Sequence, residues 1–374
     1  MSTTEIYAII GAAAGLIVFI IAYWHYRSKK NKEREAIIHN IEGAEKIRET
    51  NPAEALDIYK EALDAMSQEK YPRLYARIKH DEGVCYYALS FVNNKEDNLK
   101  RAITAYEEAL KIRTIEEFPV DYATTQNNLG NAYSILSQVR DKEEILRLAI
   151  KAYLEALIIR TSDKFPADYA RTQNSLGIAY QSLSEVRDKE DKLTLAIRAY
   201  EEALVIRTED ESPADYATTQ NNLGNAYVGL SQVRDKEANL DLAIEAYNEA
   251  LKIRTVDRFP VDYAKTQNSL GIAYRNLSQV RDKEYNLNLA IEAYKEALKI
   301  RTIDKFPVDY AVTQNNLGAA FRNLSKVRDK EANIASAISA YDEALKIWTA
   351  DRFPADYART QNNLEIARRN LNLP

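Results

Sequence analysis

The sequence predicts an all-α protein in which antiparallel helix pairs stack into a solenoid, preceded by a single N-terminal transmembrane helix. Three observations support this. A set of residues recurs at intervals of 47 through most of the 374 residues, each interval holds two amphipathic stretches, and an uncharged apolar stretch of 19 residues, Ile6–Trp24, stands near the start. The chain has only 10 Gly and 9 Pro, which favours long helices over an all-β or loop-rich fold.

The apolar stretch is long enough to cross a bilayer. As a helix it would cover about 28 Å, close to the roughly 30 Å of a hydrocarbon core. Tyr7 lies near one end, and Tyr23, Trp24 and Tyr26 lie at the other, as in an aromatic belt. We therefore expect a transmembrane anchor over residues 6–26 after a short head, residues 1–5. The alternative is a buried core helix, but a core helix rarely lacks any polar face.

The segment that follows, residues 27–36, is basic and sets the expected orientation. Its cations are Arg27, Lys29, Lys30, Lys32 and Arg34. A cleaved signal peptide carries its positive charge before the apolar stretch, whereas the head MSTTE has none. We expect an uncleaved signal anchor and a single-pass membrane protein, with the N-terminus outside and the repeats in the cytoplasm. Within the anchor, Gly11 and Gly15 form a G-x-x-x-G, a spacing that lets two membrane helices pair and the chain self-associate.

The repeat is visible in prolines, tyrosines and glycines that keep one step, for example 119 − 72 = 47. The prolines are Pro72, Pro119, Pro166, Pro213, Pro260, Pro307 and Pro354. The tyrosines of one such set are Tyr59, Tyr106, Tyr153, Tyr200, Tyr247, Tyr294 and Tyr341, and the glycines are Gly83, Gly130, Gly177, Gly224, Gly271 and Gly318.

Each unit predicts two helices joined by a short polar turn. In the unit that begins at Pro119, both stretches show the i, i+3, i+4, i+7 spacing of an amphipathic helix. Proline suits the first turn of the first helix, and Asp121 suits the positive end of its dipole. The RDKE string between the helices predicts a turn crossed by salt bridges. Gly130 in mid-helix is unfavourable by roughly 1 kcal/mol, so its recurrence predicts close contact between helices.

These units define the expected organisation. A short degenerate pair occupies residues 37–71, six 47-residue units occupy residues 72–353, and a C-terminal capping helix occupies residues 354–374. In the last helix Glu365 replaces the recurring Gly and Arg368 the recurring Tyr, as expected where no partner helix follows.

The repeats resemble the tetratricopeptide family. The match consists of Leu129, Gly130 and Tyr133 in the first helix, Ala149, Tyr153 and Ala156 in the second, and Pro166 as closing proline. The family period is 34, so this one is longer by 13 (47 − 34 = 13), which is most similar to the longer-period repeats of kinesin light chains. The resemblance implies a right-handed superhelical solenoid whose first helices line a concave groove that holds a protein or peptide.

Within that groove we expect a row of asparagines to contact the ligand. The row is Asn127, Asn174, Asn221, Asn268, Asn315 and Asn362. A carboxamide both donates and accepts hydrogen bonds, so it can pair with a peptide backbone. The alternative is that these amides bond neighbouring helices and stabilise the stack. Leu129, Tyr133, Tyr153 and their copies are expected to form the core.

Positions beside the row vary, and we expect specificity there. Asn131 and Asn225 alternate with isoleucines at the equivalent place, which suggests a doubled unit of 94 residues. Arg275 and Arg322 would make the far end of the groove basic, able to hold an acidic stretch or terminal carboxylate of the partner.

Composition narrows the function classes. The net charge of −5 leaves no footprint for nucleic-acid binding, and Cys85 with three scattered histidines forms neither a disulfide nor a metal cluster. No catalytic or cofactor motif occurs, so we expect neither an enzyme nor a bound cofactor. The leading hypothesis is a membrane-anchored scaffold that recruits a protein or peptide. The alternative is a self-assembling protein that forms a membrane-associated coat or filament.

Overall fold

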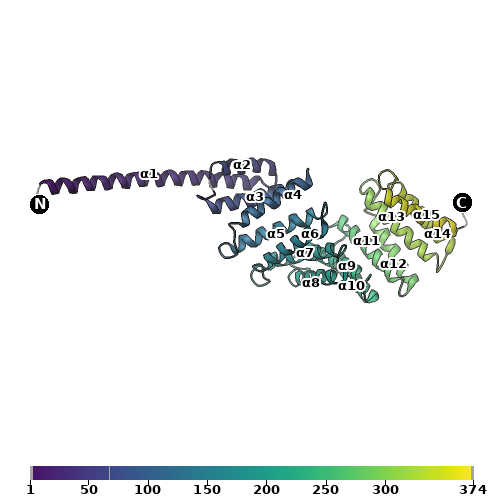
Figure 1. Cartoon of the computed structure of the whole chain (residues 1–374). Helices are drawn as coiled ribbons and strands as arrows, with labels where there is room; N and C mark the ends of the chain where they lie inside the picture. The colour runs from purple at the N-terminus through teal and green to yellow at the C-terminus, as the bar shows by residue number, and fades with distance from the viewer. Residues whose placement is uncertain (1–2, 67, 372–374) are drawn as a thin grey trace. The chain divides into compact units, whose positions relative to one another are not determined.

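A computed structural model describes residues 3–66 and 68–371, without the side chains of residues 1–18, 20 and 21. Fifteen helices and no strand occur in this described part, which confirms the predicted all-α class (Figure 1). The helices are α1 (Thr3–Ile47), α2 (Pro52–Asp64), α3 (Pro72–Leu89), α4 (Lys95–Leu110), α5 (Pro119–Leu136), α6 (Lys142–Leu157), α7 (Pro166–Leu183), α8 (Lys189–Leu204), α9 (Pro213–Leu230), α10 (Lys236–Ile253), α11 (Pro260–Leu277), α12 (Lys283–Leu298), α13 (Pro307–Leu324), α14 (Lys330–Leu345) and α15 (Pro354–Asn370).

The chain divides into two compact units, each described here by itself. Unit 1 is Met1–Asp141 and contains α1–α5, and unit 2 is Lys142–Pro374 and contains α6–α15. Within each unit every helix packs on the next along the chain. We call the proline-initiated helices of the 47-residue period A helices (α3, α5, α7, α9, α11, α13 and α15) and the helices that follow them B helices.

The N-terminal helix differs from the sequence prediction. The anchor, the basic segment and the degenerate helix around Ile37 were expected as successive segments, but α1 is one helix of 45 residues. No proline occurs in it and no glycine lies between Gly15 and Gly43, while residues 27–36 are rich in helix-forming Lys, Glu and Arg, so nothing ends the helix there. Its C-terminal part packs Ile37, Ile41 and Ala44 into the core of unit 1.

Among the described residues, no helix offers an apolar run of the length that a bilayer crossing requires. Most of the predicted span, and both Gly11 and Gly15, fall on residues whose side chains lie outside the described part. The anchor and its pairing face therefore stay predictions.

Local sequence signals account for the ends of the helices. Every A helix has its proline in the first turn. Before the B helices the chain adopts positive φ at one recurring position, with φ between 42° and 45°; the residue is Asn94 before α4 and an aspartate before each later B helix. Asn and Asp tolerate this left-handed conformation better than other residues with a Cβ.

The predicted core is largely confirmed. The tyrosines from Tyr59 to Tyr341 at the 47-residue step are at most 1% exposed. A Cβ on Gly224 would lie 2.6 Å from Cε1 of Tyr247, so the recurring glycine does mark a close helix–helix contact. The row of Tyr133 is the exception to this prediction: Tyr133, Tyr180, Tyr227, Tyr274 and Phe321 are half-buried. The Tyr133 hydroxyl donates to Glu107 Oε1 at 2.8 Å.

The RDKE turns form the expected salt bridges, and these link successive repeats. Arg187 pairs with Glu143 at 2.8 Å, Arg234 with Glu190 at 2.9 Å, and the same link recurs along unit 2. Each arginine reaches the glutamate 44 residues earlier. The turns therefore form a charged ladder along one edge of the stack.

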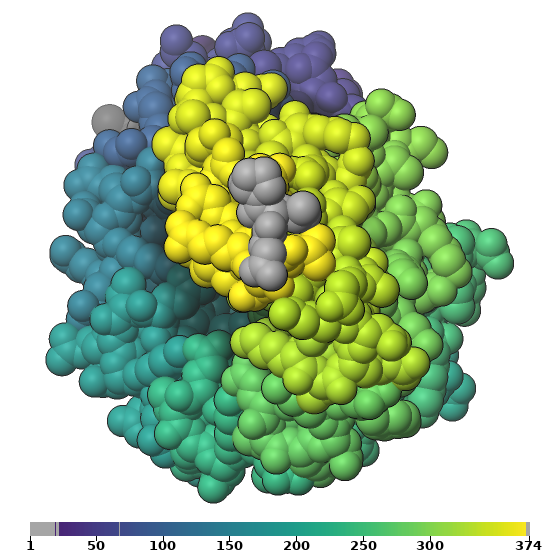
Figure 2. Space-filling view, turned by 90° about the vertical axis from the view of Figure 1, so that its right-hand side faces the viewer, coloured from purple at the N-terminus to yellow at the C-terminus, as the bar shows by residue number. Residues whose placement is uncertain are grey.

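The last helix has a polar outer face. Glu365 and Arg368 are exposed, whereas Leu364 and Ala367 are buried against α14. Figure 2 shows the surface of α15, in yellow, open to solvent. This arrangement fits the expected cap.

Candidate functional site: the exposed face of the A helices

A buried arginine that follows the preceding B helix holds each of the A helices α7, α9, α11 and α13 in place, and Trp348 stands at the same position before α15. Arg207 is 7% exposed, and its Nη1 donates to Oγ1 of Thr219 at 2.9 Å while Nη2 lies 3.6 Å from the Asp215 carboxylate. Burial lowers the pKa of Arg207, and Asp215 opposes this shift. The same bond joins Arg160 to Thr172, Arg254 to Thr266 and Arg301 to Thr313.

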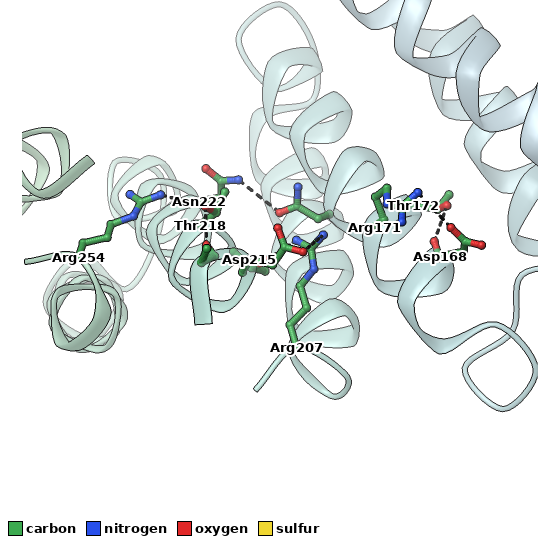
Figure 3. A network of polar contacts seen from close by, with 11 residues as sticks. Asp168, Arg171, Thr172, Arg207, Asp215, Thr218, Asn222 and Arg254 are labelled. Carbon is green, nitrogen blue, oxygen red and sulfur yellow. Dashed lines mark hydrogen bonds and ion pairs between the residues drawn. The ribbon is translucent and has the colours of Figure 1, made fainter. Parts of the chain in front are cut away.

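The arginine also reaches across repeats. The second Nη of Arg254 donates to Thr218 Oγ1 of α9 at 3.0 Å, as Figure 3 shows. A charged donor held by a threonine and an aspartate in a buried site sets the angle between pairs, because an unsatisfied guanidinium there would be strongly destabilising. The buried members of this network, such as Arg254 and Thr266, are therefore part of the scaffold, while Thr218 lies at its half-buried edge.

The predicted asparagine row lies inside the stack. Asn127, Asn174, Asn221, Asn268 and Asn315 are between 1% and 9% exposed, and Asn362 of the last helix is exposed. Asn221 Oδ1 lies 3.1 Å from Thr266 Oγ1 of the next A helix, and Asn174 Oδ1 accepts from Asn222 Nδ2 at 3.3 Å. Asn315 and Asn268 repeat these two contacts, to Thr360 and Asn316.

This placement corrects the ligand-contact interpretation of the buried members of the row. A ligand on the surface cannot reach amides that are covered by the neighbouring helix. The alternative, that these amides bond adjacent helices, fits the contacts. The two kinds of contact, to an asparagine and to a threonine of the next A helix, alternate along the array with the 94-residue doubled unit. The reason is that the residue after the buried asparagine is Asn222 or Asn316 in one kind of repeat and Ser175 or Ser269 in the other.

One residue further along each helix lies the row that is exposed to solvent or half-buried. This position and the positions four residues before and three residues after it form one stripe on each A helix. We call the members of this stripe that are not buried the A face. In unit 2 it consists of Arg171, Ser175 and Ile178 on α7; Thr218, Asn222 and Asn225 on α9; Lys265, Ser269 and Ile272 on α11; Val312 and Asn316 on α13; and Arg359, Asn363 and Ile366 on α15.

The sequence analysis placed the ligand-contact row one residue too early and therefore missed Asn222, Asn316 and Asn363. One residue corresponds to about 100° of rotation around the helix, which changes a buried position into one at the surface. A signal for them was present: the buried position is Asn in every repeat from Asn127 onward, whereas this position changes between Asn and Ser. Invariance within the array marks the stack, and variation marks the surface.

The other predicted site residues lie on or near the A face. Asn225 is half-buried and accepts a bond from the Tyr247 hydroxyl at 2.7 Å, and Asn131 is half-buried in unit 1. Arg275 and Arg322 are half-buried, and Arg322 donates to Asn363 Oδ1 at 3.1 Å. Asn225 also lines a hollow of about 240 Å³ with Gln181 of α7, Leu193 of α8 and Gly229 of α9.

The described residues contain no group of three or more His, Cys, Asp or Glu side chains placed to hold a metal ion. The donors and acceptors on the A face are amides, hydroxyls and isolated cations. Such groups suit hydrogen bonding to a polypeptide.

A sequence comparison identifies two stretches of the chain as members of a known repeat family. A sequence profile described as "Tetratricopeptide repeat" matches residues 84–114 and 222–256, each covering the end of an A helix and the following B helix. The chain contains tetratricopeptide repeats. The narrower likeness to kinesin light chains stays a prediction.

One solved structure with a TM-score above 0.5 supports the tetratricopeptide fold. The C-terminal part of a tetratricopeptide repeat-containing protein from Cytophaga hutchinsonii is 15% identical, with a TM-score of 0.53, over 87% of this chain and 99% of that one. The APC/C hetero-tetramer Cut9–Hcn1 is also similar, with 17% identity and a TM-score of 0.49 over 88% of this chain and 52% of that one. A Rap protein in complex with competence and sporulation factor is 16% identical, with a TM-score of 0.40 over 90% of this chain and 99% of that one. A search of curated proteins found no significant match.

Proposed function

We propose that this protein is a membrane-anchored interaction scaffold whose A face binds a protein or peptide. Tetratricopeptide repeats generally mediate protein–protein contacts, and no catalytic family is indicated. The observation that carries the proposal is the division of the A helices into two kinds of position. The invariant amides are used inside the stack, while the variable positions on the surface carry polar groups and isoleucines in alternation.

The amide oxygens of Asn222 and Asn316 are suited to an extended ligand. Each donates its NH₂ group to a buried asparagine of the preceding A helix, at 3.3 Å. The Oδ1 atom of each is then the group available to accept an N–H from a peptide backbone. Ile178, 40% exposed, precedes Asn222 by one repeat, and Ile272, one doubled unit further on, lies between Asn222 and Asn316, so apolar contacts alternate with these acceptors.

The binding test uses variants that the chain itself supplies. In the double variant Ile178→Asn, Ile272→Asn, both isoleucines become the residue found at Asn131 and Asn225, so the fold should tolerate them. Affinity capture from membranes with the full chain should lose its specific partner at least about tenfold, since about 1.4 kcal/mol of lost binding energy is a tenfold change. Val205→Thr, at a side chain 71% exposed outside the A face, is the control. Equal capture by the double variant and the control would exclude the A face as the binding surface.

The anchor proposal rests on the apolar stretch and the basic segment after it. Full-length chain should stay in the membrane pellet after a carbonate wash. The variant Leu16→Arg, Phe19→Arg should be released, because each arginine near a helix centre adds about 2.5–3.5 kcal/mol to insertion. Release of the unchanged chain would contradict the anchor.

Protease added outside intact cells should spare the repeats if they lie on the cytoplasmic side, and their digestion would contradict that orientation.

Self-assembly into a coat or filament is the competing function. The polar outer face of α15 opposes end-to-end stacking. Light scattering of the detergent-solubilised chain distinguishes the two: a discrete particle of one or two chains supports the scaffold, and growth with concentration supports assembly. Loss of a dimer in Gly15→Ile would assign pairing to the Gly11/Gly15 face.

A further inference from the structure

Five cations surround α1 between the predicted anchor and the part of the helix that packs into unit 1. We call Arg27, Lys29, Lys30, Lys32 and Arg34 the basic collar. All five are exposed, and none of them forms an ion pair with a described residue. Figure 1 shows α1 leaving the other helices of unit 1 as one uninterrupted helix, so the collar is held on a continuous helix and not on a flexible linker.

The cations of the collar are distributed around the helix. Successive residues of an α-helix are rotated by about 100°, so the five positions lie at about 0°, 200°, 300°, 140° and 340° around the axis. A peptide or a partner helix would contact one face of α1. Lipid headgroups surround a helix that crosses a bilayer, so the distribution of these charges fits headgroups.

The acidic residues of the same segment leave the collar positive. Glu33 accepts two bonds from Nζ of Lys70, at 2.7 and 2.8 Å, and Lys70 lies in the turn before α3. Glu35 is exposed and forms no ion pair with a described residue. Five cations therefore stand against one unpaired acid, and the repeats themselves neutralise the other.

The collar begins at the depth of the headgroups. At a rise of 1.5 Å per residue, Arg27 lies about 5 Å and Arg34 about 15 Å beyond Trp24 along the axis. The headgroup region adds about 5–7 Å to each side of the hydrocarbon core, and the Debye length at physiological salt is about 8 Å. The first three residues of the collar thus lie in or next to the headgroups, and the last two lie within a Debye length of them.

Arg73 at the start of α3 carries the positive surface onto the repeats. It is exposed, and it stands where every later repeat has valine or alanine: Val120, Ala167, Ala214, Val261, Val308 and Ala355. With Arg34 and Asp81 it lines a hollow of about 470 Å³ between α1, α3 and α5, and its guanidinium lies 4.9 Å from the centre of the Phe118 ring. The stack is complete with a small apolar residue at this position, so packing does not require the arginine.

We propose that the basic collar binds the headgroups of anionic phospholipids around the anchor. The bond between Glu33 and Lys70 then keeps the start of α3 near the membrane surface. The inference rests on the anchor of the proposed function, and it is independent of the A face. Each Lys or Arg near an anionic surface contributes about a fivefold preference, so the collar should select anionic over zwitterionic lipid by at least that factor.

The test uses a reporter that the chain already carries, because it has only two tryptophans. Trp24 is 71% exposed and adjoins the collar, whereas Trp348 is 1% exposed in unit 2. The full chain is reconstituted in vesicles of phosphatidylcholine with a minor share of phosphatidylglycerol. Bromine on the acyl chains quenches a tryptophan in contact with them, and it is placed either on the phosphatidylglycerol or on an equal amount of phosphatidylcholine. Brominated phosphatidylglycerol should quench Trp24 with at least about a fivefold preference, which should shrink in 1 M salt.

A charge-removing variant and its control complete the test. The triple variant Lys29→Gln, Lys30→Gln, Lys32→Gln should bring the two brominated lipids to nearly equal quenching. The control Lys305→Gln, Lys326→Gln, Lys330→Gln removes the same charge from exposed lysines of unit 2 and should keep the preference. Both variants should stay in the pellet after a carbonate wash, which shows that the anchor is intact.

The outcomes separate the collar from the anchor. Equal quenching of the unchanged chain by the two lipids would overturn the collar and leave the anchor in place, whereas quenching by neither would overturn both. The proposal also fails if the triple variant keeps the preference of the control. It fails as well if inorganic phosphate abolishes the preference at matched ionic strength, because the collar would then hold a free anion.

Discussion

Replacing Gly224 by alanine tests whether the repeating glycine is dictated by helix contact. In an isolated helix this change is favourable by about 1 kcal/mol. In the structure the new Cβ would lie 2.6, 2.8 and 2.9 Å from Cε1, Cδ1 and Cζ of Tyr247. Carbon atoms in good contact are about 3.5–4.0 Å apart, so α9 and the ring of Tyr247 on α10 must separate by roughly 1 Å.

The ring cannot easily make that room. Tyr247 is 1% exposed, and its hydroxyl is held by Asn225 Oδ1 at 2.7 Å. Overpacking of this kind costs about 1–3 kcal/mol, and with three ring atoms inside 3.0 Å we take the upper end. Subtracting the gain of about 1 kcal/mol in helix propensity leaves a net loss of about 2 kcal/mol in the free energy of unfolding.

The measurement is urea unfolding of the full chain in detergent, followed by circular dichroism. Amide hydrogen exchange of α9 and α10 accompanies it, because stacked repeats open locally. Gly43→Ala is the matched control: no atom lies within 4 Å of the added Cβ, so it should stabilise α1 by about 0.5–1 kcal/mol. The double variant Gly224→Ala, Tyr247→Leu should show a favourable coupling of at least about 1 kcal/mol. If Gly224→Ala stabilised the protein as Gly43→Ala does, contact with the tyrosine would not be the reason for the glycine.

Three further predictions follow from buried and exposed polar groups. Asn221→Ala should lower the free energy of unfolding by about 1 kcal/mol because it removes the hydrogen bond between the buried Asn221 and Thr266, whereas Ser175→Ala on the A face should change it by less than about 0.5 kcal/mol; equal costs in urea unfolding would contradict the assignment of the two rows. Burial holds the pKa of His80 at about 3, below its usual 6.5, so the unfolded chain binds the extra proton and the stability from neutral His80 is lost as the pH falls from 6.5 towards 3. Between pH 7 and pH 5 the free energy of unfolding of His80→Asn should therefore fall by about 2 kcal/mol less than that of the unchanged chain. An equal shift of the urea midpoint in both chains would refute this. The raised pKa of Asp81 gives the opposite slope between about pH 4 and 6, but Asp81 is present in both chains. Arg187→Gln in the exposed ladder should lower the urea midpoint only slightly at low salt and not measurably in 1 M salt, because salt screens exposed ion pairs. A loss of stability that persists in 1 M salt would show that the ladder is more than surface electrostatics.

The helices and their pairing could be predicted from the sequence because their signals are local. The proline equivalent to Pro166 starts a helix in each repeat, and the spacing of apolar residues around Tyr200 defines the buried face of its helix. The 47-residue step shows that every unit packs in the same way. Gly177 could be read as a contact point for the same reason. The continuity of the N-terminal helix through residues 27–36 could not be predicted, since these residues favour a helix whether they serve as a linker or as part of α1.

The identity of the exposed row needed the tertiary structure. Asn174 and Ser175 differ by one position, and only the neighbouring A helix decides which of them is covered. The partners involved lie 45 to 48 residues away, beyond the reach of any helical period. The sequence alone determined that the chain stacks helix pairs, because burial of an amphipathic face depends on spacing within one helix. Packing between helices decided which polar side chains remain available to a partner, because contact between distant segments determines which of them already have hydrogen-bond partners. The same packing brings Arg73 and Asp81 together with α1 around one cavity.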